Sequence, residues 1–295
     1  MRLGDERESS NYVDETGRGG FGGGGGSPLG CLIPLVLSRF GIGGLVILLI
    51  GYFILSSLGG LGGQGGLAPS SQQVGAPAGR STLDPTTRHF TLQVLASTED
   101  TWGKLLGGCY TPTTLVFYSE ADRSGCGMAQ SAMGPFYCPN DQRIYLDTEF
   151  FGELARRFQA PGDFAMAYVI AHEVGHHVQD LTGGLGQAEQ LQARASRTEG
   201  NAIQVKVELQ ADCLSGVWVN KEKQKRPNFI EEGDIDAALQ TANAIGDDTL
   251  QRQAQGRVVP DSFTHGSAEQ RKRWFMTGYQ QGTVQACNTF GSDSP

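Results

Sequence analysis

The sequence predicts an α+β fold, a helix-dominated domain with a small β-sheet, preceded by one transmembrane helix. Three observations support this prediction. One long apolar run lies between two glycine-rich stretches in the first 80 residues, apolar residues recur at helical spacing over most of the remainder, and two short runs are rich in β-branched and aromatic residues. Residues 81–295 are long enough for a single domain with a sizeable buried core.

Residues 1–39 and 59–80 have the composition of flexible chain. Residues 19–26 read GGFGGGGG, and residues 59–79 are again rich in Gly, without a periodic apolar pattern. We therefore expect residues 1–39 to form a cytoplasmic, Gly-rich disordered tail and residues 59–80 to form a flexible linker.

The apolar run at 40–58 predicts a membrane-spanning helix. It contains no charged residue over 19 positions, close to the ~20 residues that cross a bilayer as a helix. Cationic residues lie on its N-terminal side, at Arg2, Arg7, Arg18 and Arg39, and this asymmetry places that side in the cytoplasm. The sequence thus predicts a single-pass protein of the cell membrane whose folded domain is extracytoplasmic, in the periplasm or at the cell exterior. The alternative is a cleaved signal peptide, because small residues follow the run, although the region before the run is long for a signal peptide.

The charge excludes one class of function. With 23 Lys and Arg against 31 Asp and Glu, the net charge is -8 and the isoelectric point is near 5.2. A nucleic-acid binder usually presents a basic surface, so we expect no nucleic-acid partner.

Six cysteines agree with an oxidising compartment. Cys31 precedes the apolar run, five others lie in the folded part, and none forms the CxxC pair of a structural zinc site. Spacing does not fix the connectivity, but we favour Cys126–Cys138, which closes a short loop, and Cys213–Cys287, which ties the last segment back. Cys109 is then the free thiol. The alternative is a cytosolic protein with reduced, buried cysteines.

The elements of the folded part follow from periodicity and turn residues. Apolar spacing predicts a helix over 88–106, and β-branched or aromatic runs predict strands over 113–119 and 142–148. Residues 148–158 look helical, and the next helix starts after Pro161-Gly162, with Asp163 as N-cap, and ends at Gly183-Gly184. Two or three further helices are expected at about 187–222, 234–246 and 267–281.

The segment HEVGH at 172–176 matches HExxH. On a helix, positions i and i+4 lie about 40° apart around the axis and about 6 Å apart along it, so His172 and His176 present both imidazoles to one point. Two such imidazoles suit a tetrahedral zinc ion. Glu173 lies on the flank of the pair, where it can act on a water molecule as general base without binding the metal. The alternative, two surface histidines, is disfavoured by the nearly apolar turns that precede them.

A catalytic zinc site needs a third protein ligand, and Glu208 is the candidate. Glu208 and Asp212 lie one turn apart on an expected helix, among apolar neighbours that suggest burial. Asp212 would accept a hydrogen bond from the outer nitrogen of a ligating histidine and fix its tautomer. Two solvated carboxylates on a helix face are the alternative interpretation, and the carboxylates that compete for the ligand role are Asp180, Glu189 and Glu199.

The other histidines have different expected roles. His177 points about 100° away from His176 around the helix, so we expect no metal contact from it, and we take His89 as structural. His265 lies at an expected helix start with Ser267 as cap and Gln270 at N3, and it could donate a hydrogen bond to the oxyanion of a tetrahedral intermediate. The alternative is a loop histidine that orders the turn.

At these residues the chain resembles the YpfJ-type neutral zinc metallopeptidases of bacteria. The resemblance rests on the apolar run and on four stretches, which are CGMAQSAMGPFYCPNDQRIYLD at 126–147, GDFAMAYVIAHEVGHHVQ at 162–179, ELQADCLSGVW at 208–218 and THGSAEQRKRWFMTGY at 264–279. The resemblance implies a gluzincin-like, zincin-type metallopeptidase domain over 81–295. A similarity to membrane metallopeptidases of the HtpX type supports Glu208 as ligand and makes Arg271, beside His265, an expected residue of the site.

Together these features predict a membrane-anchored zinc metallopeptidase, an endopeptidase that takes protein or peptide substrates. Zn²⁺ held by His172, His176 and Glu208 would lower the pKa of a water molecule, and Glu173 would take the proton and deliver it to the leaving amine. The strand at 142–148 could bind substrate backbone by strand addition. The alternative is a non-catalytic, zinc-stabilised scaffold or binding protein of the cell envelope, which would not need Glu173.

Overall fold

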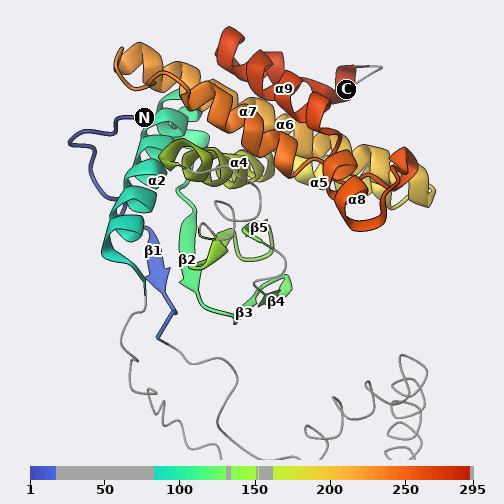
Figure 1. Cartoon of the computed structure of the whole chain (residues 1–295), viewed down its shortest axis with the longest axis horizontal. Coiled ribbons are helices and arrows are strands. Elements are labelled where there is room, and N and C mark those ends of the chain that lie inside the picture. The colour runs from blue at the N-terminus through green and yellow to red at the C-terminus, as the bar shows by residue number, and fades with distance from the viewer. Residues whose placement is uncertain (18–82, 131–133, 151, 153–161, 293–295) are drawn as a thin grey trace, which may run out of the picture. The chain divides into compact units, whose positions relative to one another are not determined.

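The sheet is built from short strands whose side chains alternate between two apolar layers. The computed structural model describes residues 1–17, 83–130, 134–150, 152 and 162–292 (Figure 1). The strands of the main sheet, in spatial order, are β1 (Tyr12–Asp14), β2 (Thr114–Tyr118), β6 (Arg143–Asp147) and β5 (Phe136–Cys138). The first three run parallel, and β5 pairs antiparallel with β6 at one edge. A separate hairpin joins β3 (Ala121–Ser124) to β4 (Gly127–Gln130).

The two faces of the sheet belong to two hydrophobic cores. Leu115 and Phe117 of β2 are fully buried in the large core, together with apolar side chains of the helices. Val116 and Tyr118, which point the opposite way because strand side chains alternate, lie in a smaller cluster with Tyr145. The large core therefore lies between the sheet and the helices.

The helices gather on one side of the main sheet (Figure 1). Their bounds are α2 Pro85–Leu106, α4 Asp163–Leu181, α5 Gly184–Gln192, α6 Arg197–Lys225, α7 Asp234–Ala244, α8 Asp247–Gln255 and α9 Ala268–Gln281. Short 3-10 helices follow at Val284–Cys287 and Thr289–Gly291. Two glycines bring α6 and α9 close together, since a Cβ at Gly278 would lie only 1.8 Å from the carbonyl oxygen of Cys213 and one at Gly216 only 2.1 Å from that of Phe275.

Most predicted elements are confirmed, and the differences have local causes. The strands expected at 113–119 and 142–148 are β2 and β6, and Ser267 and Gln270 form the expected capping box of α9. Gly162 rather than Asp163 is the N-cap of α4, at a φ of 117° that favours glycine. The single helix expected over 187–222 is two helices, because the side chains of Ser196 and Glu199 form a capping box that starts α6.

Other differences concern elements that the sequence pattern did not predict. Helix α8 and strands β1, β3, β4 and β5 were not expected. The prediction that 142–148 could receive substrate backbone is wrong, because β6 is hydrogen-bonded on both sides, to β2 and to β5. Most of the helix expected over 148–158 lies outside the described residues.

The first 17 residues belong to the folded unit. Strand β1 pairs with β2, and the side chains of Ser9 and Arg7 donate hydrogen bonds to the Glu99 carboxylate of α2 at 2.5 and 2.8 Å. The amino group of Met1 forms an ion pair with Asp234 of α7 at 2.9 Å. The prediction of a disordered tail over 1–39 is therefore wrong for residues 1–17. This segment is ordered because it hydrogen-bonds to the Glu99 carboxylate of α2 and pairs with one edge of β2.

This packing also corrects the expected membrane topology. Two strands that pair in one sheet lie on the same side of any membrane, so residues 1–17 and residues 83–292 lie on one side, and the opposite placement predicted from the cationic residues is wrong. The apolar run at 40–58, the rest of the tail, the linker at 59–80 and Cys31 lie outside the described residues. Within the part of the chain that the structure describes, no helix has both the length and the apolar character needed to cross a bilayer.

Both predicted disulfides are present. Cys126 pairs with Cys138, which fastens the loop before β5, and Cys213 of α6 pairs with Cys287, while Cys109 is free and exposed. Disulfides form and persist in oxidising compartments, so this pairing indicates an extracytoplasmic domain.

Candidate metal centre

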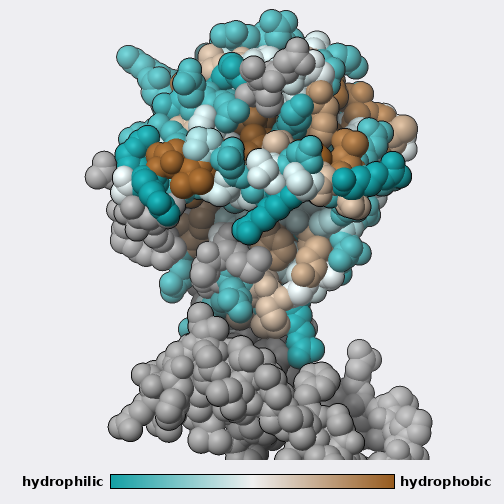
Figure 2. All heavy atoms as spheres, turned by 90° about the vertical axis from the view of Figure 1, so that its right-hand side faces the viewer, coloured by the Kyte–Doolittle hydropathy of each residue, from teal (hydrophilic) through white to brown (hydrophobic). Residues whose placement is uncertain are grey.

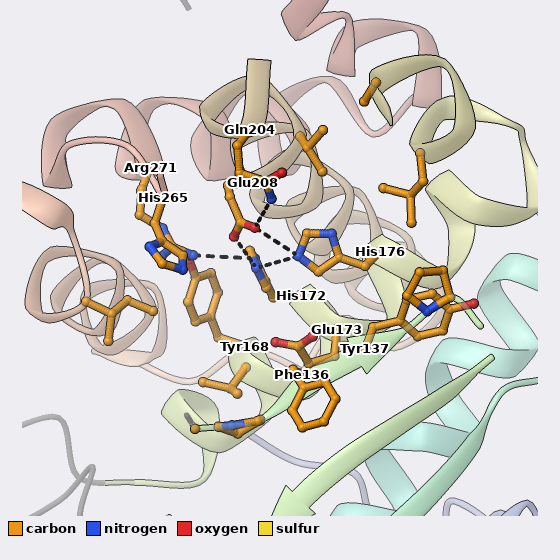
Figure 3. A pocket seen from close by; sticks show the side chains of 18 of the residues that line it. Phe136, Tyr137, Tyr168, His172, Glu173, His176, Gln204, Glu208, His265 and Arg271 are labelled. Carbon is orange, nitrogen blue, oxygen red and sulfur yellow. Dashed lines mark hydrogen bonds and ion pairs between the residues drawn. The ribbon is translucent and has the colours of Figure 1, made fainter. Parts of the chain in front are cut away.

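Helix α4 presents two imidazoles to one point (Figure 3). His172 and His176 are separated by one helical turn, and their Nε2 atoms lie 3.2 Å apart. The turns before His172 are buried and apolar, because α4 passes through the large core. The His172 side chain is therefore held by packing, with only 6 % of the residue exposed.

Helix α6 supplies the carboxylate. Glu208 Oε2 lies 3.3 Å from the Nε2 atom of His172, and Glu208 Oε1 lies 3.7 Å from the Nε2 atom of His176. The close approach of α4 and α6 depends on Gly175, since a Cβ at this position would lie 3.0 Å from the Ala211 carbonyl oxygen. The glycine inside the HEVGH motif thus lets Glu208 reach the histidines.

The geometry of this group fits a tetrahedral cation. Zinc bonds of about 2.0–2.1 Å place neighbouring ligand atoms roughly 3.3 Å apart at the tetrahedral angle. The three ligand atoms of His172, His176 and Glu208 all lie within 4.8 Å of one another, and the closest pairs are 3.2 and 3.3 Å apart. Two imidazoles and one carboxylate are also the ligand types of a catalytic zinc site with an open fourth position.

The outer nitrogen of each histidine has its own partner. The Nδ1 atom of His172 lies 2.8 Å from Asp212 Oδ1, and the Nδ1 atom of His176 lies 2.8 Å from Gln179 Oε1. An acceptor at Nδ1 directs the lone pair of each ring to Nε2, the atom that faces the other ligands. Asp212 was expected in this role, and Gln179 was not.

Asp212 is the centre of a buried hydrogen-bond network. Arg271 of α9 donates to both of its oxygens, each at 2.9 Å, and the hydroxyl of Tyr168 donates to Oδ1 at 2.5 Å. Burial alone would raise the pKa of Asp212, but Arg271 and His172 hold it below its usual value. The network brings Arg271, expected here from the resemblance, to within 3.5 Å of His172 Nδ1.

The charges at the centre favour a cation between the ligands. Burial opposes the charged form of His172, but Asp212 and Glu208 outweigh it and raise the pKa of this histidine to about 10. Burial likewise opposes the ionised form of Glu208, yet His176 and His172 hold its pKa well below the usual range. A positive charge is therefore favoured at this point, either a proton or a divalent ion that replaces it.

Glu173 lies beside the ligand group without joining it (Figure 3). The residue is 7 % exposed, and its side chain lines the same cavity as the histidines. Burial raises its pKa, and this effect exceeds the opposite effects of His172, His176 and a backbone hydrogen bond from Tyr137. A carboxylate with a raised pKa takes up a proton more readily than an ordinary carboxylate, as a general base must.

His265 lies at the other wall of the cavity, near Arg271 (Figure 3). Its side chain is 52 % exposed, and its Nδ1 atom lies 3.3 Å from Asp247 Oδ1. The hydrogen bond from His265 to Asp247 raises the pKa of His265 more than burial lowers it. The other Asp247 oxygen accepts the backbone N–H groups of residues 264–266, so the turn that carries His265 is fixed by α8.

The cavity in front of the centre has a volume of about 880 Å³. Its walls combine the ionisable side chains described above with apolar ones from several elements, which are Phe136, Phe150, Val169, Leu185, Val207, Ile245 and Leu250. Strand β5 forms one rim, and Gln204 donates to Glu208 Oε1 at 3.1 Å. The right-hand side of Figure 1, where α5 and α8 lie, carries apolar patches among mainly hydrophilic side chains (Figure 2).

The remaining candidates lie apart from the ligand group. His177 is buried between the Thr111 carbonyl oxygen and the Tyr137 hydroxyl, at 2.6 and 3.0 Å, and Asp180 accepts from the same hydroxyl at 2.7 Å. His89 pairs with Glu8 at 2.6 Å. Of the other two competing acids, Glu189 lines the cavity and Glu199 caps α6.

Sequence reasoning missed several residues of the site. Tyr168 lies one turn before His172, Gln179 three residues after His176, and Gln204 one turn before Glu208. Each lies three or four positions from a proposed ligand on the same helix, where side chains are neighbours. The residues at i±3 and i±4 from the ligands could therefore have been predicted to contact them. No such signal existed for Asp247, which reaches His265 from another helix.

Comparisons with known proteins agree with this geometry. The family model described as "Putative neutral zinc metallopeptidase" matches residues 1–290. The chain is 45 % identical to "Uncharacterized protein YpfJ" of Escherichia coli strain K12, over 99 % of both chains. It is 44 % identical to "Uncharacterized protein Rv2575" of Mycobacterium tuberculosis strain H37Rv, over 66 % of this chain and 68 % of that protein. No solved structure matches the chain.

Proposed function

Because the chain belongs to the neutral zinc metallopeptidase family, we propose that it is a membrane-associated endopeptidase that hydrolyses peptide bonds with Glu173 as general base. One observation carries the proposal. Two imidazoles and the Glu208 carboxylate converge within bonding range of a single ion, and a second, separate carboxylate, that of Glu173, lies beside them at the wall of a cavity. A purely structural metal site has no use for Glu173.

Each residue of the centre has a separate role in hydrolysis. Zinc bound by His172, His176 and Glu208 would supply Lewis acidity, which activates water and polarises the substrate carbonyl. Glu173 takes the proton of the attacking water and passes it to the nitrogen of the leaving amine. His265, whose pKa is raised by its hydrogen bond to Asp247 and whose side chain lines the cavity, donates to the oxygen on which negative charge develops.

The architecture supports a zincin-like mode of substrate binding. Strand β5 is an edge strand beside the cavity, so its outer backbone groups are free of sheet partners within the described residues. An extended peptide that added to this edge would run past Glu173 and the ligand group, with its side chains directed alternately toward the apolar walls. The disulfide Cys126–Cys138 anchors the end of this strand.

The apolar run at 40–58 supports membrane association. It contains no charged residue over 19 positions, and its two flanks continue into one folded unit. We propose that the run attaches the protein to the cell membrane from one side, with the catalytic unit and the N-terminal segment together outside the cytoplasm, where the disulfides form.

The decisive experiment compares the wild-type full chain with Glu173→Gln. Both proteins are purified in detergent, zinc content is measured, and cleavage of a mixed peptide pool is followed by mass spectrometry. We expect both to bind one zinc ion and only the wild type to cleave. Zinc binding without cleavage by either protein would contradict the enzyme proposal and favour the scaffold alternative. Cleavage by both would remove Glu173 as the base.

A further inference from the structure

A buried glutamine connects His176 to the rest of the fold. Gln179, 2 % exposed, lies on the turn of α4 after His176, and its Oε1 atom is 2.8 Å from His176 Nδ1. Its Nε2 atom donates to the carbonyl oxygen of Val207 at 2.8 Å and to Gln210 Oε1 at 2.9 Å, both on α6. All the polar atoms of this amide thus have partners.

These partners determine the tautomer of His176. A backbone carbonyl can only accept, so the NH₂ group of Gln179 must face Val207 and its oxygen must face His176. The Nδ1 atom of His176 is then the donor, and the lone pair of the ring lies on Nε2, toward Glu208 and His172. In the same way, Asp212 accepts the hydrogen bond from Nδ1 of His172 and leaves the lone pair of that ring on Nε2.

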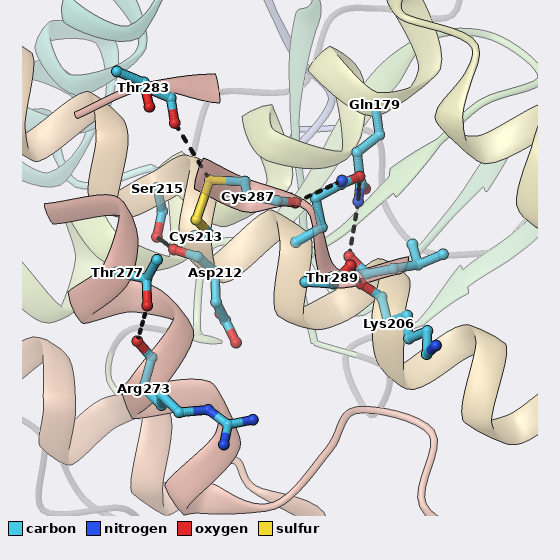
Figure 4. The surroundings of a disulfide bond; sticks show 12 residues. Gln179, Lys206, Asp212, Cys213, Ser215, Arg273, Thr277, Thr283, Cys287 and Thr289 are labelled. Carbon is cyan, nitrogen blue, oxygen red and sulfur yellow. Dashed lines mark hydrogen bonds between the residues drawn. A yellow bond between two sulfur atoms is a disulfide. The ribbon is translucent and has the colours of Figure 1, made fainter. Parts of the chain in front are cut away.

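The network continues to the end of the chain (Figure 4). Gln210 donates through Nε2 to the carbonyl oxygen of Cys287 at 2.8 Å, and this second carbonyl fixes the orientation of the Gln210 amide. Cys287 is bonded to Cys213 of α6, and the hydroxyl of Thr289, fully buried, donates to the Lys206 carbonyl oxygen at 2.7 Å. The C-terminal segment, defined as residues 284–291, is therefore fastened along α6 at several points.

We propose that Gln179 is a positioning residue for His176 and that Gln210, together with the C-terminal segment held by the Cys213–Cys287 disulfide, keeps Gln179 in the required orientation. The inference rests on the proposed zinc site and adds to it a structural reason for the disulfide. Without the disulfide, the Cys287 carbonyl is no longer fixed against Gln210, and the amide of Gln179 can rotate away from the orientation that His176 needs.

The test measures zinc affinity of the full chain by competition with a fluorescent chelator, together with the Tm of the zinc-free protein. We expect Gln179→Met, which fills the same space without an acceptor, to bind zinc about 10- to 100-fold more weakly than wild type. Gln179→Glu keeps an acceptor for His176 and should bind zinc more tightly than Gln179→Met. A merely structural glutamine predicts the reverse order, because a buried charge is harder to accommodate than a thioether.

Two further variants test the outer part of the network. Gln210→Met and the pair Cys213→Ser/Cys287→Ser should both weaken zinc binding. The matched control for the disulfide is Cys126→Ser/Cys138→Ser, and for the glutamines it is Gln240→Met at an exposed position of α7. Both controls should leave zinc affinity unchanged even where they lower the Tm. If Gln179→Met fails to fold, these variants still carry the test.

The outcomes separate the inference from the proposed function. Equal zinc affinity of wild type and Gln179→Met, or weaker binding by Gln179→Glu than by Gln179→Met, overturns the positioning role. A loss in the Cys213/Cys287 pair no larger than in the Cys126/Cys138 pair overturns the role of the C-terminal segment. A wild-type chain that binds no zinc would instead refute the proposed function itself.

Discussion

Replacing Gly175 with Ala tests whether the contact between α4 and α6 sets the metal site. The new Cβ would lie 3.0 Å from the carbonyl oxygen of Ala211, 3.1 Å from its Cα and 3.3 Å from its Cβ. Ordinary carbon contacts are about 3.5–4.0 Å, so the two helices must separate by roughly 0.5–1 Å at this point. Glu208 lies one turn before Ala211 on α6, so it moves with that helix.

The expected effect follows from the tolerance of a zinc site. Ligand distances hold to within about 0.2 Å, so a shift of this size cannot be absorbed without strain. Overpacking of a close contact costs about 1–3 kcal/mol, against a gain of about 1 kcal/mol from the better helix propensity of alanine. If 1–3 kcal/mol of strain falls on the zinc-bound state, zinc affinity drops about 5- to 150-fold.

The assay is chelator competition at fixed pH, combined with thermal unfolding of the zinc-free protein. Gly200→Ala is the matched control, because Gly200 lies in α6 and a Cβ there meets nothing within 4 Å. The control should keep wild-type zinc affinity and gain a little stability. If Gly175→Ala bound zinc as tightly as Gly200→Ala, the idea that this glycine brings Glu208 to the histidines would be refuted.

Four further predictions concern the contacts of individual side chains. Zinc affinity should rise as pH rises from about 6.5 to 10. Burial lowers the pKa of His172, but Asp212 outweighs burial and raises this pKa to about 10, so zinc must displace the proton. Calorimetry at pH 7 in two buffers should show release of about one proton, and a pH-independent affinity would contradict the assignment. In the zinc-free protein the same raised pKa contributes stability that is present below about 6.5 and is lost as pH rises toward 10, which urea unfolding across this range will show. Arg271→Leu removes the guanidinium that donates to both oxygens of the fully buried Asp212 carboxylate and should cost about 3–5 kcal/mol of unfolding free energy, measured in urea. An unchanged midpoint would count against the network. Ser9→Ala removes the 2.5 Å hydrogen bond to Glu99 and should lower the free energy of unfolding by about 1–3 kcal/mol. Ser10→Ala, at an exposed position, should leave this free energy unchanged. Equal stabilities of the two variants would mean that the N-terminal segment is not docked.

The parts of the fold that depend on neighbouring residues were predictable from the sequence. The HEVGH spacing within one helix sets the relation between His172 and His176, and the apolar spacing predicts α2, α4 and α9 with small errors at their ends. The capping box at Ser267 follows from two residues three positions apart. In each case the physical cause lies within one or two helical turns.

The parts that depend on distant contacts were less accessible. Glu208 could be suggested only because a zinc site requires a third ligand, and its approach depends on Gly175, whose role appears in the packing of α4 on α6. Strand β1 has three residues and no alternating pattern, so its own sequence does not predict a strand. These residues are extended because they pair with β2. The edge position of β5 likewise follows from sheet order, which single-strand patterns do not contain.

The docking of the first 17 residues has a consequence for biosynthesis. Ser9 and Glu99 are 90 positions apart, so Ser9 emerges from the ribosome well before its partner exists. At about 5–20 residues per second, the delay is on the order of ten seconds. During that interval the opening segment has neither its partner strand β2 nor Glu99 to bind. If the protein is exported as we propose, the early segment and the late domain must reach the same compartment before the sheet can close. A variant that leaves the early segment in another compartment should yield a protein that lacks β1 at the edge of its sheet.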